Sequence, residues 1–587
     1  MKNREIAEIF ETIADLLEIK GETVFRVAAY RRAGEALRAL GHDVKNIWEE
    51  GDLEVIPGVG KAIAAKIDEL LRTDHLDFYE NLTAEVPPGL ADVLKVGGVG
   101  PKKAAHFWKE LGITTIDELE QAARTGKLRQ LSGIGERSEA RILENIIALK
   151  RHHTGRVLLD EAWIPAQKLL AQLREIEGVQ RAEAAGSLRR MRETIGDLDL
   201  VVGARDTSLV IKAFVAFPEV DRVLGQGETK ASVELIDGLR VQLWVHPPER
   251  FGSALQYATG SQGHNVRLLE AAQKAGLSLS EHGYQDQEGG MTFCVEEEDV
   301  YAVLELPWIP PALREDSGEI KAAKEGELPQ LVELEDLKGE LHTHSDWSDG
   351  KSSILGLADA AINLGMEYLV ISDHSRSLGI AGGLSIEDLR AQRAEIKRVQ
   401  KEIGKKLTLL QGSEVEILAN GELDYPDEVL QELDVVIASL HQSLRQPRQK
   451  VTERVLRTIM NPHVDILAHP TGRLIGRRDP ADLDIDAILQ AAAEHDVVLE
   501  INSNPERLDL KDTHARRALE SGCRLAINTD AHHPDHFTFR RFGVGTAQRA
   551  WAEAPSIVNT WPLERLQAWL ISRDRFRQTA TSQRFRG

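Results

Sequence analysis

The C-terminal part of the chain alternates short strand-like runs with helical stretches, and this alternation constrains the fold more than any other feature. From residue 337 onward, seven apolar runs end at or near Leu341, Ile371, Leu410, Ser439, Leu467, Ile501 and Ile527. Strands alternating with helices form parallel sheets, either closed into a barrel or doubly wound. In a barrel, the carboxyl ends of all strands converge on one face.

Candidate metal ligands follow six of these seven runs, and the remaining run, the sixth, carries Glu500 and no histidine. The ligands are His342, His344, Asp349, His374, Glu414, His441, His469, Asp530 and His532. A set of imidazoles and carboxylates without cysteine suits Mn²⁺, Zn²⁺ or Fe. Nine ligands exceed the need of one ion, so we expect two to three ions. Clustered ions activate water and stabilise both oxygens of a phosphodiester displacement.

These motifs resemble the PHP (polymerase and histidinol phosphatase) domain. The resemblance covers about residues 337–575 and implies a (βα)₇ barrel with a trinuclear metal site. The family's ligand positions fall on the nine residues named above, and all nine are of the expected type. The resemblance therefore implies a working metal-dependent hydrolase.

A second candidate metal site lies in the middle of the chain. Gly186-Ser187-Leu188-Arg189-Arg190 is followed by Asp197-Leu198-Asp199, whose two carboxylates face one side of a strand. Such a pair can bridge two Mg²⁺ ions that bind a triphosphate. We expect Gly186 and Ser187 to offer an amide and a hydroxyl to phosphate, and Arg190 to add charge. An isolated Asp-x-Asp is common and is often a solvated strand edge. Gly-Ser at this spacing before Gly-Asp-Leu-Asp is a far more specific pattern.

The combined motif resembles the nucleotidyltransferase palm of family X DNA polymerases. A later segment, Tyr257-Ala258-Thr259-Gly260-Ser261 followed by Asn265, also matches. The resemblance implies that Asp197 and Asp199 are catalytic ligands of Mg²⁺ or Mn²⁺. It also implies that Tyr257, Gly260 and Asn265 contact the incoming dNTP. Ala258 replaces an aromatic residue of the family, which puts sugar discrimination in doubt.

The chain departs from the family at Gln242. The family has a third aspartate there, 15 residues before Tyr257. With a two-residue turn at Asp237-Gly238, Glu234 is expected to pair with Val241 and to point to the other face, leaving Val233 opposite Gln242. No neighbouring carboxylate then substitutes, so polymerisation is expected to be weak, dependent on Mn²⁺, or lost.

The N-terminal 150 residues are expected to be almost all helical. Three Gly-x-Gly turns each open a new helix, and they resemble helix-hairpin-helix motifs, which bind DNA phosphates through backbone amides. Their glycines are Gly58, Gly60, Gly98, Gly100, Gly133 and Gly135. The first region also resembles the lyase-type domain of family X polymerases, whose Schiff-base lysine falls on Lys66. Arg26, Tyr30 and Arg31 match its neighbours, but Ala62 replaces a family lysine, and Lys66 as a solvated helix lysine is an equal alternative.

Composition bounds these interpretations. The net charge of −22, from 72 Lys and Arg against 94 Asp and Glu, argues against indiscriminate nucleic-acid binding but allows local sites. Two distant cysteines exclude a disulfide framework or a cysteine zinc cluster. The chain has no apolar run of membrane-spanning length and no signal-peptide core, so we expect a cytoplasmic monomer at the bacterial nucleoid that does not bind membranes.

The expected fold class is multidomain α and α/β. The predicted order is a lyase-like helical domain (1–85), a fingers-like helix-hairpin-helix domain (86–154), the palm start (155–240), the palm end and thumb (241–310), a linker (311–336), the PHP barrel (337–575) and a basic tail (576–587). The arginines of the tail could contact nucleic acid or simply be frayed.

Three hypotheses follow for function. The first is a DNA repair enzyme that fills gaps with dNTPs and processes 3′ ends as a metal-dependent 3′–5′ exonuclease and abasic-site endonuclease, acting on gapped or nicked DNA. The second is a repair nuclease whose polymerase-defective palm only binds DNA. The third is a phosphatase of small phosphoesters, against which the helix-hairpin-helix candidates argue.

Overall fold

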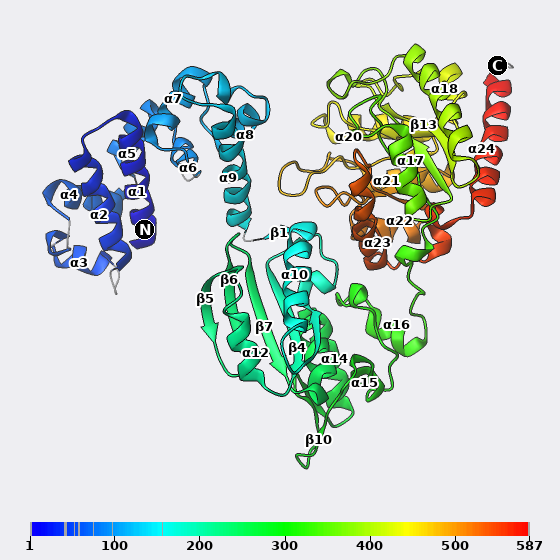
Figure 1. Ribbon diagram of the computed structural model, residues 1–587. Helices are drawn as coiled ribbons and strands as arrows, with labels where there is room; N and C mark the ends of the chain where they lie inside the picture. The colour runs from blue at the N-terminus through cyan, green and yellow to red at the C-terminus, as the bar shows by residue number, and fades with distance from the viewer. Residues whose placement is uncertain are drawn as a thin grey trace. The chain divides into compact units, whose positions relative to one another are not determined.

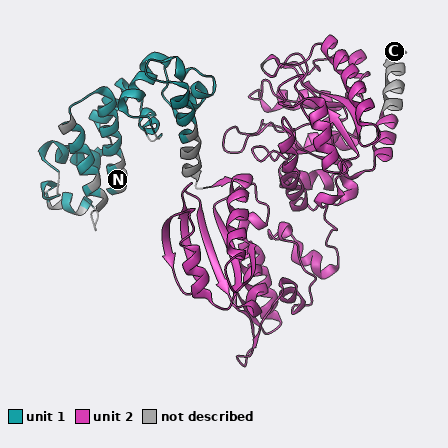
Figure 2. Cartoon of the chain, in the orientation of Figure 1, with its two compact units in different colours: residues 1–155 teal, residues 156–587 magenta. Residues whose placement is uncertain are grey.

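The computed structural model describes residues 3–39, 44–51, 53–56, 59–73, 75–94, 96, 98–154 and 156–584, with some helical side chains, including 574–584, outside the description. The chain forms two compact units, residues 1–155 and 156–587 (Figure 2). Figure 1 gives the element labels used below.

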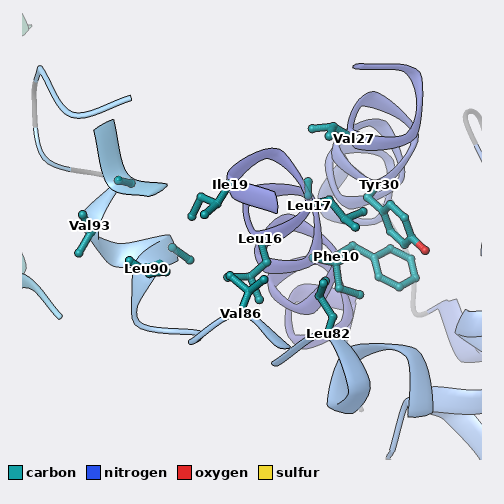
Figure 3. Close-up of a cluster of buried hydrophobic side chains, with 14 of the residues drawn as sticks. Phe10, Leu16, Leu17, Ile19, Val27, Tyr30, Leu82, Val86, Leu90 and Val93 are labelled. Atoms are coloured by element: carbon teal, nitrogen blue, oxygen red, sulfur yellow. The ribbon is translucent and has the colours of Figure 1, made fainter. Parts of the chain in front are cut away.

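The first unit is helical, as its apolar spacing predicts. Its helices are α1 (Asn3–Lys20), α2 (Val24–Ala39), α3 (Val44–Glu50), α4 (Lys61–Thr73), α5 (Asp77–Glu85), α6 (Leu90–Val93), α7 (Pro101–Leu111), α8 (Ile116–Arg124) and α9 (Glu136–Thr154). One hydrophobic cluster joins them, and Figure 3 shows α1 contributing Phe10, Leu16 and Leu17 to its centre. A single core therefore runs through both helical regions of this unit.

The second unit begins with a five-stranded sheet in the order β2-β4-β7-β6-β5, in which β4 and β7 are parallel. The elements here are β1 (Val157–Leu158), β2 (Val179–Ala184), β3 (Thr194–Ile195), β4 (Asp197–Ala204), β5 (Val220–Gln226), β6 (Lys230–Leu235), β7 (Arg240–His246), α10 (Leu159–Arg174), α11 (Gly186–Arg189), α12 (Thr207–Phe214), α13 (Phe251–Thr259) and α14 (Gln262–Lys274). Alternate residues are buried along β6, β7 and the start of β4, so one face of the sheet is core and the other is open there, while α13 covers the open face farther along β4.

The β6–β7 hairpin corrects the expected register. Its loop has three residues, Ile236 to Gly238, because Leu235 donates its amide to the carbonyl of Leu239 at 2.9 Å. Gly238 takes the left-handed conformation (φ 84°) that closes such a loop. The pairs are therefore Ser232 with Gln242 and Glu234 with Arg240. The predicted pairing of Glu234 with Val241 was wrong, and Glu234 lies on the same face as Gln242.

A smaller region follows, with strands β8 (Ser278–Ser280), β9 (Gly283–Gln285) and β10 (Met291–Thr292) and helices α15 (Glu297–Ala302) and α16 (Glu319–Glu325). Residues 311–336, expected as a linker, are folded here. Arg314 is fully buried and donates to Glu297 at 2.6 Å, and Glu319 binds buried His264 at 2.7 Å. This segment therefore packs as part of the unit instead of spanning a gap.

The C-terminal region is the predicted parallel barrel. Its strands, adjacent in chain order, are β11 (Gly339–Glu340), β12 (Tyr368–Ile371), β13 (Thr408–Glu416), β14 (Val435–Ser439), β15 (Ile466–Leu467), β16 (Val498–Asn502) and β17 (Leu525–Asn528). A parallel bridge between Thr343 and Ala531 joins the first and last strands. The (βα)₇ expectation is thus confirmed, although β13 runs past Leu410 and includes Glu414.

The barrel helices are α17 (Ile354–Asn363), α18 (Ile386–Ile403), α19 (Asp427–Leu430), α20 (Arg448–Ile459), α21 (Ile485–Glu494), α22 (Asp512–Glu520), α23 (Arg540–Arg549) and α24 (Leu563–Arg584). The predicted tail from 576 is helical up to Arg584, and its side chains lie outside the description. Among the helices that the structure describes, none combines the length and apolar character of a bilayer span.

Candidate metal centre, nucleotide site and DNA-binding turns

All nine predicted metal ligands meet at one end of the barrel. Their donor atoms form three groups, in each of which the atoms lie within 4.8 Å of one another: His344, Asp349, His374 and His532; His342, His344 and Asp530; and His374, Glu414 and His441. His469 joins through Glu414, with its Nε2 2.9 Å from Oε1. Three groups that share members fit two to three bridged ions.

Further carboxylates orient these ligands, and the sequence analysis did not assign them to the site. Glu500 lies 2.8 Å from Nδ1 of His342, and Glu416 lies 2.9 Å from Nδ1 of His441. A carboxylate on the second ring nitrogen fixes the tautomer so that the first nitrogen can bind a metal. The sequence did point to Glu500, because this carboxylate lies on the one strand, β16, that carries no histidine at its end.

The electrostatics match a site built for cations. Burial lowers the pKa of His374, but Glu414 and Asp349 outweigh it and raise the pKa to about 10. The pKa of His532 rises to about 9, since Asp349 and Asp530 outweigh its burial. The same histidines hold the pKa of Asp349 well below its usual range despite its burial. The carboxylates therefore attract positive charge, which metal ions supply more strongly than protons do.

The Asp-x-Asp pair lies on the open face of the central sheet. Asp197 and Asp199 are on β4, and Asp199 is the register partner of Gln242 on β7. A Cβ added to Gly186 would lie 2.1 Å from Oδ2 of Asp199, so only glycine lets the carboxylate rest against α11. Burial, followed by the charge of Asp197, raises the pKa of Asp199 to about 7. A carboxylate that ionises reluctantly beside a second carboxylate is a natural site for divalent cations.

Gln242 contacts this pair directly. Its Nε2 donates a hydrogen bond to Oδ2 of Asp197 at 2.7 Å. An amide in this place occupies a carboxylate lone pair and brings no negative charge. On the same face, Glu234 accepts from Nη2 of Arg222 at 3.1 Å. Glu234 is a diagonal neighbour of Gln242, a separation of about 7–8 Å between Cα atoms that long side chains can cross.

The other predicted nucleotide residues cluster beside α11 and α13. Ser187 is half-buried in the first turn of α11. Gly260 ends α13, and Asn265 donates to the carbonyl of Tyr257 at 2.9 Å. Arg190 donates to the carbonyl of Thr259 and to Glu315 at 2.9 Å. The structure thus joins Arg190 to the segment that carries Tyr257, and the guanidinium is held by protein acceptors.

Lys66 lies on α4 beside an aromatic residue that sequence reasoning missed. Its ammonium is 4.9 Å from the centre of the Phe78 ring, and Arg26 is 5.4 Å from the same ring. Tyr30 stacks on Phe78 with a centroid distance of 5.8 Å. Arg31 instead pairs with Asp15 and Glu18 on α1. Phe78 therefore assembles Lys66, Arg26 and Tyr30, and Arg31 does not join them.

The three Gly-x-Gly turns share one backbone hydrogen bond. In each, the amide between the two glycines donates to the carbonyl three residues earlier: Val59 to Ile56 at 3.0 Å, Val99 to Val96 at 3.0 Å and Ile134 to Leu131 at 3.2 Å. Added Cβ atoms at Gly60, Gly100 and Gly135 would meet nothing within 4 Å, so the backbone there is open. Gly98 and Gly133 take left-handed conformations, and Gly58 lies outside the described residues.

Family models match four parts of the chain. The description "Helix-hairpin-helix domain" fits residues 1–76, and "SAM-like Helix-hairpin-helix tandem" fits 90–146. The description "DNA polymerase beta thumb" fits 254–315, and "PHP domain" fits 340–504. A helix-hairpin-helix region, a polymerase-type thumb and a PHP barrel in one chain define the class of family X polymerases that carry a PHP domain.

Full-length similarity then identifies the family. The chain is 37% identical over 578 residues to the DNA polymerase/3′-5′ exonuclease PolX of Bacillus subtilis (strain 168), covering 98% of this chain and 100% of that protein. The chain therefore belongs to the PolX family. It is also 26% identical over 342 residues to DNA polymerase lambda of Rattus norvegicus, over 53% of this chain and 56% of that protein. A probable phosphatase of Thermoanaerobacter sp. (strain X514) is 30% identical over 203 residues, covering 32% of this chain and 77% of that protein.

Proposed function

We propose that this protein is a DNA repair enzyme with two active sites: a palm that adds nucleotides at gaps and a barrel that degrades DNA from 3′ ends. The observation that carries the proposal is the gathering of the nine predicted ligands at one end of the barrel. In the same chain, Asp197 and Asp199 form a carboxylate pair that is a second candidate metal site. The B. subtilis relative is named as both a DNA polymerase and a 3′-5′ exonuclease, and the similarity extends over nearly the full length of both chains.

In the barrel, the ligand geometry supports phosphodiester hydrolysis. When bound, Mn²⁺, Zn²⁺ or Fe would supply Lewis acidity and an activated water. Glu414 lies among five histidines, within 2.8 Å of His374 and 2.9 Å of His469, so its carboxylate would help to hold the ions. Glu500 and Glu416 hold the imidazoles in place. An abasic-site endonuclease activity would use this same site.

In the palm, Asp197 and Asp199 would hold Mg²⁺ or Mn²⁺ with the dNTP, and Gly186 and Ser187 would receive its phosphates. Since Arg190 is held by Glu315, we assign it to positioning the Tyr257–Asn265 segment, which would contact the nucleotide. The missing third carboxylate makes insertion weak. Glu234 is the one candidate on this face of β6 that could supply it, by leaving Arg222.

A second candidate function is a repair nuclease with a polymerase-defective palm. The hydrogen bond from Gln242 to Asp197 favours it, because the amide occupies a carboxylate oxygen and supplies no negative charge that could help to activate a primer hydroxyl. A phosphatase of small phosphoesters is disfavoured. The phosphatase relative covers only 32% of the chain, and a small phosphoester would leave the three Gly-x-Gly turns without a role.

The remaining assignments concern DNA. We propose that the turns at Gly58, Gly60, Gly98, Gly100, Gly133 and Gly135 bind phosphates of gapped or nicked DNA through helix N-termini. We also propose a 5′-deoxyribose phosphate lyase role for Lys66, with Phe78 as a platform. The enzyme would act as a monomer at the bacterial nucleoid.

The test is single-nucleotide insertion on a 5′-phosphorylated one-nucleotide gap in Mg²⁺ and in Mn²⁺. All variants carry His342→Ala and His344→Ala to silence degradation, and degradation itself is measured with both histidines restored. Insertion by wild type that disappears in Asp197→Ala supports the polymerase. If insertion is also lost in Glu234→Gln, Glu234 is the third carboxylate. Insertion seen only in Gln242→Asp supports the repair nuclease. A wild type that neither inserts nor degrades DNA refutes both.

A further inference from the structure

An arginine with one unsatisfied buried nitrogen borders the barrel's predicted metal ligands. Arg507 lies on the loop after β16, and its side chain is 17% exposed. Its Nε is 3.8 Å from Oδ2 of Asp530, beyond hydrogen-bond distance, while Asn502 donates to that oxygen at 3.1 Å. Among the residues that the structure describes, Nη1 of Arg507 is buried without a hydrogen-bond partner. The guanidinium is therefore next to the metal site but not bound to it.

A buried guanidinium nitrogen without an acceptor is destabilising, so its retention beside a reaction centre calls for a ligand. A second cation lies near it: burial, and then the charge of Arg507, lowers the pKa of Arg478. Arg478 is already bound through Nε to the carbonyl of Gly472 at 2.8 Å, whereas Nη1 of Arg507 is buried without an acceptor. Planar guanidinium groups bind phosphate oxygens in pairs, which suits an anionic ligand here.

Contacts with both the barrel and the palm region fix the loop that carries Arg507. Arg473 donates to the carbonyls of Arg507 at 2.8 Å and Leu508 at 2.5 Å, and it also pairs with Glu193 of the palm region at 2.8 Å. Leu508 is 1% exposed and belongs to the hydrophobic cluster of the palm sheet, in the left-handed conformation (φ 39°). The guanidinium is thus placed by both regions of the second unit.

We propose that Arg507 binds the non-bridging oxygens of the phosphate cleaved in the barrel, and holds the 5′-phosphate of the released mononucleotide. This inference rests on the proposed nuclease function. In that reaction the water oxygen bonds to phosphorus, the bond to the 3′ oxygen breaks, and a proton passes to the 3′ oxygen. The phosphate keeps a negative charge throughout, and Arg507 is a cation beside it that does not depend on metal.

The experiment titrates thymidine 5′-monophosphate and thymidine into the manganese-loaded full-length protein by calorimetry. The variants are Arg507→Met, Arg507→Lys and, as a matched control, Arg524→Met. Arg524 immediately precedes β17 at the opposite end of the barrel and pairs with Asp496. Bound manganese is counted by elemental analysis in every sample, and unfolding temperatures are compared.

We expect Arg507→Met to weaken binding of the monophosphate about 10- to 100-fold, the range of a hydrogen-bonded charge. Arg507→Lys should fall between wild type and Arg507→Met, with thymidine binding, manganese content and Arg524→Met unchanged. Equal monophosphate affinity in wild type and Arg507→Met overturns the inference, as does loss of manganese in Arg507→Met, which would make the arginine a support for Asp530. Wild type that neither binds the monophosphate nor degrades DNA with manganese instead refutes the nuclease function itself.

Discussion

Replacing Asp199 by Asn should stabilise the metal-free protein at neutral and alkaline pH. The pKa of Asp199 rises from 3.8 to about 7, mainly by burial and then by Asp197. Its ionised form is therefore less stable in the folded than in the unfolded chain. At pH 8 the group is ionised in both the folded and the unfolded chain. The difference of about 3 in pKa then lowers the free energy of unfolding of wild type by at most about 4 kcal/mol. At pH 5 Asp199 is protonated in the folded chain, and this destabilisation falls to about 2 kcal/mol. Below pH 4 it vanishes.

The assay is urea unfolding in EDTA at pH 5 and pH 8, followed by tryptophan fluorescence, since Trp244 lies two residues after Gln242 on β7. The free energy of unfolding of Asp199→Asn minus that of wild type should rise by about 2–3 kcal/mol between the two pH values. Asp221→Asn, an exposed aspartate on β5, is the matched control and should show no such rise. Mg²⁺ should stabilise wild type more than the variant.

The outcome that contradicts the reasoning is a stability difference that does not change with pH. It would mean that the carboxylate of Asp199 is solvated in the folded chain. A variant less stable than wild type at pH 8 would show that the carboxylate makes favourable contacts that outweigh its burial. Either result would show that the burial of Asp199 does not favour a cation in the palm.

Substitutions at three further positions test individual contacts. Gly186→Ala places a Cβ 2.1 Å from Oδ2 of Asp199 and should lower nucleotide insertion about 100-fold, measured on gapped DNA; unchanged insertion would refute the packing role of this glycine. Glu416→Gln should weaken manganese binding about 10–100-fold in a chelator competition, and unaltered affinity would show that the carboxylate does not orient its histidine. Leu508→Ala should lower the free energy of unfolding by about 2–5 kcal/mol and Leu508→Met by less than about 1.5 kcal/mol, whereas equal effects would argue against a tightly packed site.

Much of the molecule follows from local sequence. The alternation of apolar runs predicts the parallel barrel, because strand and helix periods are properties of short segments. The gathering of the nine predicted ligands follows from the sequence because a barrel brings its strand ends together, so that position along each strand determines position in space. The helical N-terminal region and its Gly-x-Gly turns follow in the same way, since Gly98 and Gly133 take conformations that favour glycine.

Tertiary structure decided what depends on register and on distant partners. A three-residue loop in place of a two-residue loop moved Glu234 onto the face of Gln242, because a shift of one residue exchanges the two faces of a strand. The attachment of Arg190 to Glu315, of Lys66 to Phe78, and of Glu500 to His342 joins residues far apart in the chain. Arg507 is the clearest case. The sequence shows an arginine in a loop. Only the packing of two regions around it places its guanidinium beside Asp530 with one nitrogen buried and unsatisfied, since burial and hydrogen bonding are properties of the folded whole.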